Sequence, residues 1–298
     1  MKRKVIQIAD STQLVSLPRK WCLQHGIRKG DEVEVEENGN KIQISTAKEA
    51  LLETAKIHFS NSDTFLQRPL MTFYRLGYDQ VEITFDDPQV IPRIQDEIER
   101  LMGFEIVNQT ERSCVVKNVA SAMDTEFESI LRRIMLMLIE MARDTSEALS
   151  KHNFSNMEEI TKRERLNNKL SIFCERILNK KGYPDHKRLT SVYYVVCNLE
   201  HIADNLCDIC LYCIKKKPKI SPSITKLVKD TTQLIEQLYG LFYKFDLDNL
   251  VAFKKKHSSI ERDATALLNS GKKENIQIIQ SVLMAIEKIR HMSAYCVN

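Results

Sequence analysis

The sequence predicts a multidomain, mainly α-helical protein with three successive parts. Gly (8) and Pro (7) are scarce among 298 residues, which favours long uninterrupted helices. Helical periodicity runs almost unbroken from Asp124 to the end of the chain, whereas the first 46 residues alternate as short strands do. Between them, helix and strand patterns interchange. We therefore expect domains at residues 1–46, 47–120 and 121–298.

Residues 1–46, here called the head, are expected to form strands around one short helix. Pro18 suits the first turn of that helix, and Gly26 stops it. Asn38-Gly39 predicts a hairpin turn between the last two strands. A unit of this size is too small to bury a core alone, so we expect it to dimerise. The strands are expected at 5–8, 14–17, 33–35 and 42–44, and the helix at 19–25.

Basic side chains gather in the head, although the whole chain carries a net charge of only +4. Before residue 30 the sole acid is Asp10, and acidic residues dominate the next stretch. A local basic cluster is typical of a DNA-binding surface, with cations on phosphates and Gln13 on base edges. An ordinary solvated surface is the alternative. The candidate DNA-binding residues are Lys2, Arg3, Lys4, Gln13, Arg19, Lys20 and Arg28.

Residues 47–120 are predicted to form a linker helix and then a small α+β module. Apolar residues at 47, 51, 52 and 55 have helical spacing within 47–60, and Asn61-Ser62-Asp63 ends that segment. The module that follows is expected to contain helices at 65–76 and 91–102 and strands at 81–85, 104–107 and 114–116.

The remaining residues predict an antiparallel helical bundle, because short turns separate long helices. Residues 156–164 resemble residues 249–257, and residues 199–204 resemble residues 286–291. The bundle is therefore expected to consist of two three-helix repeats, at about 121–214 and 221–298. Its helices are predicted at 124–152, 155–180, 186–214, 221–245, 248–269 and 273–296.

Acidic residues form a stripe on the third helix of this bundle. Glu200, Asp204 and Asp208 recur every four residues, so they lie along one helix face. Carboxylate oxygens grouped in this way suit divalent ions, and a solvated face is the alternative. Glu287 and His291 have the corresponding spacing in the second repeat.

The eight cysteines are expected to be reduced thiols of a cytoplasmic protein, because no signal peptide precedes them. Cys207, Cys210 and Cys213 lie within a continuous helical pattern and do not share one helix face, so core packing is preferred over metal binding. No apolar run of 18 residues occurs, and we expect no membrane insertion.

The third predicted helix of the bundle resembles the LERIGD signature of PhoU-family phosphate-signalling proteins. The matching segment is Asn198-Leu199-Glu200-His201-Ile202-Ala203-Asp204-Asn205. This resemblance implies two three-helix repeats that carry divalent or ferric ions such as Fe, Zn or Mg. Asn167 and His291 stand where the family usually has acids. The complete set of candidate metal ligands is Glu164, Glu200, Asp204, Asp208, Glu287 and His291.

The head is similar to the SpoVT/AbrB/MazE swapped-hairpin DNA-binding domains. The similarity rests on Arg3-Lys4-Val5, Val15-Ser16-Leu17-Pro18, Gly26-Ile27 and Gly30-Asp31-Glu32-Val33-Glu34-Val35. It implies a homodimer in which two chains interlock their hairpins into one β-barrel that presents basic loops to DNA. The family's loop arginine is absent from Ser11-Thr12-Gln13. The order of the three parts resembles archaeal phosphate-uptake regulators.

We therefore expect a DNA-binding transcriptional regulator of phosphate uptake and phosphate homeostasis with a PhoU-like sensing tail. Its expected partners are double-stranded DNA, a second copy of the chain, and components of a phosphate ABC transporter or a sensor kinase. The alternative is an adaptor that binds such a transporter or histidine kinase and uses the head only to dimerise. An enzyme is not expected, because no Gly-rich phosphate loop, nucleophile elbow or Glu-x-x-His pair occurs.

Overall fold

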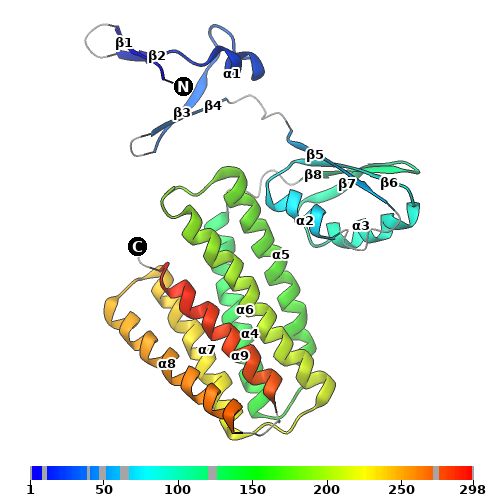
Figure 1. Cartoon of the computed structure of the whole chain (residues 1–298), viewed down its shortest axis with the longest axis vertical. Coiled ribbons are helices and arrows are strands. Elements are labelled where there is room, and N and C mark those ends of the chain that lie inside the picture. The colour runs from blue at the N-terminus through cyan, green and yellow to red at the C-terminus, as the bar shows by residue number, and fades with distance from the viewer. Residues whose placement is uncertain are drawn as a thin grey trace. The chain divides into compact units, whose positions relative to one another are not determined.

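The computed structural model shows two compact units, Met1–Thr54 and Ala55–Asn298 (Figure 1). The first unit contains the head. The second unit combines an α+β module with a helical bundle. The structure describes residues 2–8, 12–38, 41–46, 52–60, 67–119, 126–270 and 275–296.

In its described residues the head consists of two antiparallel hairpins and one short helix, as predicted. Its elements are β1 (Val5–Ile8), β2 (Thr12–Val15), α1 (Arg19–Gln24), β3 (Val33–Asn38) and β4 (Lys41–Thr46). β1 pairs with β2 and β3 pairs with β4, in two separate two-stranded sheets. β2 begins at residue 12, whereas the predicted strand begins at residue 14. Gly26 follows α1 with a φ of 62°, which a glycine adopts at little cost.

The head has no core of its own among its described side chains, since none of them is buried. Trp21 is half-buried, with its ring centroid 5.2 Å from that of His25. A two-stranded hairpin is marginally stable alone, and clustered exposed apolar residues mark an interaction surface. Among the head residues that the structure describes, eight large apolar side chains are exposed: Val5, Ile6, Ile8, Leu14, Val15, Leu23, Val35 and Ile42.

The α+β module of the second unit has a four-stranded sheet in the order β5-β6-β8-β7, accompanied by two helices (Figure 1). β8 pairs antiparallel with both β6 and β7. The elements are β5 (Thr54–Phe59), α2 (Gln67–Arg75), β6 (Gln80–Phe85), the 3-10 turn η1 (Pro88–Val90), α3 (Ile91–Ile98), β7 (Phe104–Gln109) and β8 (Ser113–Asn118). α3 ends at Ile98, before the predicted end at residue 102.

The predicted linker helix over 47–60 is wrong in its described part, because residues 54–59 form β5. Ala55 and Phe59 are buried and Ile57 packs against the core, whereas Lys56 and His58 are exposed. This alternation is the two-residue period of a strand. A short apolar run fits both the helical and the strand period. In this segment the pairing with β6 selects the strand. Residues 47–51 lie outside the described part of the chain.

The described residues of the bundle form six long helices, and each corresponds to a predicted one. They are α4 (Phe127–Ser150), α5 (Met157–Lys181), α6 (Leu189–Lys216), α7 (Pro222–Tyr243), α8 (Leu247–Asn269) and α9 (Ile276–Ser293). The first repeat, α4–α6, and the second repeat, α7–α9, meet through α4 against α7 and α6 against α9. Within the described residues, no helix has the length and apolar character needed to cross a membrane.

The three closely spaced cysteines of α6 are core residues, as predicted. Cys207, Cys210 and Cys213 are buried, and burial raises the pKa of each thiol to about 12. The neutral thiol is therefore the form present at neutral pH.

Candidate functional sites

All the candidate DNA-binding residues of the head are exposed. Three precede β1, one lies on β2, two begin α1 and one follows Gly26: Lys2, Arg3, Lys4, Gln13, Arg19, Lys20 and Arg28. The turn after Gly26 holds Arg28 in place, since the Arg28 N–H donates to Asp31 Oδ2 at 2.9 Å and the Asp31 N–H donates to the Arg28 carbonyl at 3.1 Å. The cations are thus available to phosphates, as DNA binding requires.

Glu164, Glu200 and Asp204, here called the acidic motif, lie on the facing helices α5 and α6. Asn168 donates from Nδ2 to Glu164 and to Asp204 Oδ1, the latter at 3.4 Å. Burial, together with the nearby Asp204, raises the pKa of Glu164. A cavity of about 700 Å³ opens beside the motif, and basic groups at Arg100 and Lys169 line it together with Glu164 and Glu200. Three of the four predicted first-repeat ligands, Glu164, Glu200 and Asp204, therefore lie close together.

Arg75 already neutralises one member of the acidic motif. Arg75 is the last residue of α2. Its Nη2 lies 3.3 Å from Glu200 Oε2, and its Nε lies 2.7 Å from Glu175 Oε2. Burial nevertheless raises the pKa of Glu200 to about 7, an effect that Arg75 opposes. Sequence reasoning missed both Arg75 and Glu175. Arg75 and Glu200 are 125 residues apart, so local spacing holds no signal for their contact.

The remaining predicted ligands, Asp208, Glu287 and His291, lie outside this motif. Asp208 is exposed one turn beyond Asp204, and burial followed by the Asp204 charge raises its pKa. Glu287 is exposed on α9. His291 has its Nε2 2.7 Å from Arg290 Nη2, so a guanidinium stands beside this imidazole.

The predicted ligands do not fit a metal site in this arrangement. Among the described residues, no three His, Cys, Asp or Glu side chains are grouped so as to hold one ion. Structural and catalytic metal sites generally use three or more protein ligands. Here Glu164 and Asp204 offer two carboxylates, while Glu200 is paired with Arg75. Metal binding stays a prediction.

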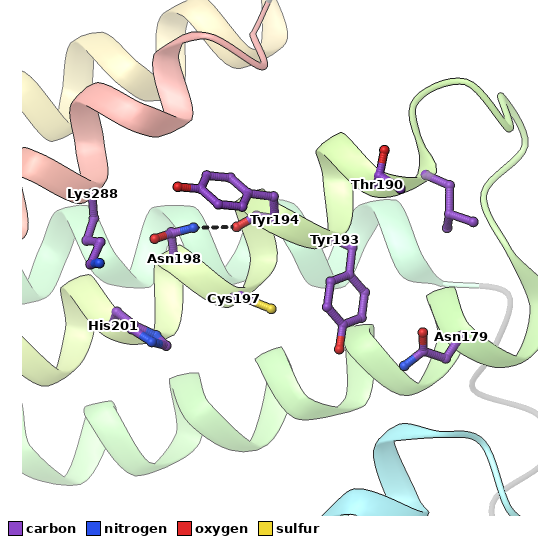
Figure 2. A pocket seen from close by; sticks show the side chains of 9 residues that line it. Asn179, Thr190, Tyr193, Tyr194, Cys197, Asn198, His201 and Lys288 are labelled. Carbon is purple, nitrogen blue, oxygen red and sulfur yellow. Dashed lines mark hydrogen bonds between the residues drawn. The ribbon is translucent and has the colours of Figure 1, made fainter.

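A second cavity, of about 600 Å³, lies against α6 (Figure 2). Tyr193, Tyr194 and Cys197 supply its apolar walls, and His201 of α6 and Lys288 of α9 supply basic groups. Pockets of this size and character accommodate small organic molecules. The basic groups complement a ligand that carries an anionic group beside an apolar ring.

The fold and surfaces define a protein with a basic, strand-rich N-terminal domain and a helical C-terminal bundle. A family model described as "Antidote-toxin recognition MazE, bacterial antitoxin" matches residues 6–51. The predicted resemblance of the head to the MazE/AbrB domains is therefore confirmed over these residues.

One solved structure similar to the chain is that of the phosphate transport system regulatory protein PhoU from Streptococcus pneumoniae. The similarity has a TM-score of 0.41 and 14% sequence identity, and it covers 58% of this chain and 89% of that chain. No curated protein matches the sequence.

Proposed function

We propose that the protein is a dimeric, DNA-binding transcriptional regulator of phosphate uptake. The observation that carries this proposal is the head, where residues 6–51 match the MazE family model and the basic candidate residues are exposed. The phosphate signal is inferred from the signature-like segment 198–205 and from the two three-helix repeats of the bundle. The proposed role is regulatory and includes no catalytic step.

Dimerisation of the head is supported by its exposed apolar side chains. Every residue of β1 is exposed in one chain, including Val5, Ile6 and Ile8, so neither face of this strand is buried. Burying such surface is the main driving force for association. We propose that the hairpins of two heads interlock into one barrel, so that each chain supplies the strands and the apolar cover that the other lacks.

In the proposed mechanism the bundle senses and the head responds. The α+β module lies between them in the sequence, so a change of packing in the bundle can reach the head through it. In this mechanism the bundle has two packing states that differ in their affinity for the signal. Binding of the signal to one state then shifts the population of dimers that can bind DNA.

DNA binding is tested by electrophoretic mobility shift with a duplex from upstream of the protein's own gene, at several salt concentrations. The exchange of Arg3 and Lys4 for Ala is expected to weaken binding and to lower the salt dependence by about two released ions per head. The matched control exchanges the exposed Lys254 and Lys255 of α8 for Ala and should bind normally. No binding by the wild-type chain at low salt would refute the proposal.

An adaptor function is the second candidate, and one observation favours it. Ser11-Thr12-Gln13 stands where the resembled DNA-binding domains carry a loop arginine, which leaves fewer groups to read bases. Pull-down of phosphate-transporter components and of a sensor kinase by the full chain distinguishes the two functions. Capture without any DNA binding would favour the adaptor.

A further inference from the structure

The cavity of about 600 Å³ beside α6 is built from both repeats of the bundle (Figure 2). Its lining residues on α6 recur every four positions from Leu189 to His201, so one side of this helix forms the floor over about 18 Å. Asn179 of α5 and Lys288 of α9 complete the lining. A molecule bound in this cavity therefore contacts the first repeat through α6 and the second repeat through α9.

The end of the cavity near the start of α6 is apolar. Leu189 and Tyr193 lie one turn apart, and Tyr194 lies beside them. The Tyr194 ring packs on the Tyr295 ring with their centroids 4.8 Å apart, which restricts its orientation. Burial, followed by the charge of Glu175, raises the pKa of Tyr193, so its phenol is neutral at neutral pH. Tyrosine rings arranged in this way bind aromatic groups.

The opposite end of the cavity is polar. Asn198, His201 and Lys288 lie there, and Figure 2 shows the Lys288 side chain extending from α9 toward the other two. Asn198 is 6% exposed, and its Nδ2 donates to the Tyr194 carbonyl at 2.8 Å, so the backbone of α6 fixes this amide. Within the described part of the chain, no carboxylate pairs with the Lys288 ammonium. This end of the cavity therefore suits an anionic group.

The wall between the two ends is uncharged at neutral pH. Cys197 lies midway along α6, and burial, followed by the charge of Glu175, raises the pKa of its thiol to about 12. Glu175 itself is 3% exposed and pairs with Arg75 at 2.7 Å, so its charge is compensated behind the wall. An anion in the cavity is thus attracted by the Lys288 ammonium and meets neutral side chains along the wall.

We propose that this cavity binds a small aromatic monocarboxylate. Its ring packs on Tyr193 and Tyr194, and its carboxylate accepts hydrogen bonds from Lys288 and His201. Tyr193 and His201 are eight residues apart, about 12 Å along the helix axis, so a short spacer joins the ring to the carboxylate. A doubly charged phosphate suits the cavity less well, because its second charge would lose water without gaining a cation. This binding is independent of the proposed binding to DNA.

Fluorescence titration of the full chain with dansylglycine tests the proposal. Dansylglycine carries a naphthalene ring and one carboxylate on a short spacer, and dansylamide is its uncharged counterpart. The wild type is expected to bind one dansylglycine per chain, about tenfold more tightly than dansylamide. Lys288→Met should abolish this preference and leave the affinity for dansylamide unchanged. The matched control is Lys229→Met, at an exposed position of α7 outside the cavity.

Thr190→Trp tests the apolar end, because an indole at this exposed lining position narrows the space beside Tyr193. It should weaken the binding of both probes by about fivefold or more. Circular dichroism checks that each variant folds, which exposed and half-buried surface positions generally permit.

Three outcomes would overturn the proposal. The wild type could bind neither probe up to about 1 mM, or it could bind both equally well. A preference for dansylglycine could persist in Lys288→Met. Binding could also be unchanged by both Lys288→Met and Thr190→Trp, which would place the probes on another surface, such as the exposed apolar residues of the head.

Discussion

At the residue scale, Arg176 shows how a buried charge is accommodated. Its side chain is 2% exposed, and its guanidinium lies 4.9 Å from the Tyr74 ring centroid and 5.3 Å from that of Phe104. Asp79 and two backbone carbonyls accept its hydrogen bonds. A buried cation is tolerated when its donors are satisfied in this way, and removing it takes one donor from each of these acceptors.

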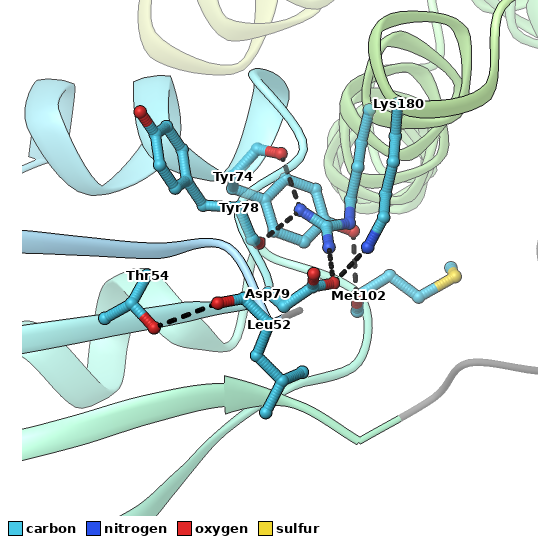
Figure 3. A network of polar contacts seen from close by, with 8 residues as sticks. Leu52, Thr54, Tyr74, Tyr78, Asp79, Met102 and Lys180 are labelled. Atoms are coloured by element: carbon cyan, nitrogen blue, oxygen red, sulfur yellow. Dashed lines mark hydrogen bonds and ion pairs between the residues drawn. The ribbon is translucent and has the colours of Figure 1, made fainter. Parts of the chain in front are cut away.

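Exchanging Arg176 for Met should therefore destabilise the second unit by about 1–3 kcal/mol, because the Tyr74 and Tyr78 carbonyls each lose a donor, while Asp79 keeps its ion pair with Lys180 (Figure 3). Urea unfolding followed by circular dichroism measures the change. The matched control is Arg133→Met at an exposed position of α4, with an expected cost below about 0.5 kcal/mol. Equal midpoints for the two variants would contradict the role assigned to Arg176.

At the element scale, β5 separates what periodicity can and cannot decide. The bundle helices are long, so many turns support one period, and all six occur where the sequence predicts them. β5 is six residues long and contains Ala55 and Phe59, whose spacing of four also fits a helix. Its strand conformation follows from hydrogen bonding to β6, a partner more than 20 residues away in sequence. Local pattern does not contain that information.

The side on which Ile57 lies tests this assignment. In a strand it shares the inner face with Ala55 and Phe59, whereas a helix would place His58 on that face instead. Ile57→Ser is expected to cost about 1–3 kcal/mol, and His58→Ser less than about 1 kcal/mol, because the exposed His58 loses only its contacts with Thr84 and Asp86. Thermal unfolding of the two variants gives the comparison. A larger cost at His58 would support the helix.

At the scale of the whole molecule, the head and the second unit differ in how they bury apolar residues. The second unit has a continuous core that runs from the α+β module through both repeats. The head leaves its apolar residues exposed within one chain. A protein built in this way is expected to associate through the head.

Ile6→Asp combined with Val35→Asp should therefore convert dimers into monomers, because two buried charges oppose association. Analytical ultracentrifugation at micromolar concentration measures the oligomeric state. Val107→Asp serves as the control, since Val107 is 50% exposed on β7 while Ile6 and Val35 are both 57% exposed. Dimers that survive the head substitutions but not Val107→Asp would relocate the interface to the second unit.

The sequence by itself determined the three-part order, the hairpins and short helix of the head, and the six helices of the bundle, since each depends on local periodicity, turn residues and charge. Helical spacing also grouped Glu200 with Asp204, whereas only the resemblance to the PhoU family added Glu164 to them. Only the tertiary structure decided that residues 54–59 form a strand and that Arg75 pairs with Glu200. Both depend on contacts between distant segments, and such contacts form only when burial of the shared core brings those segments together.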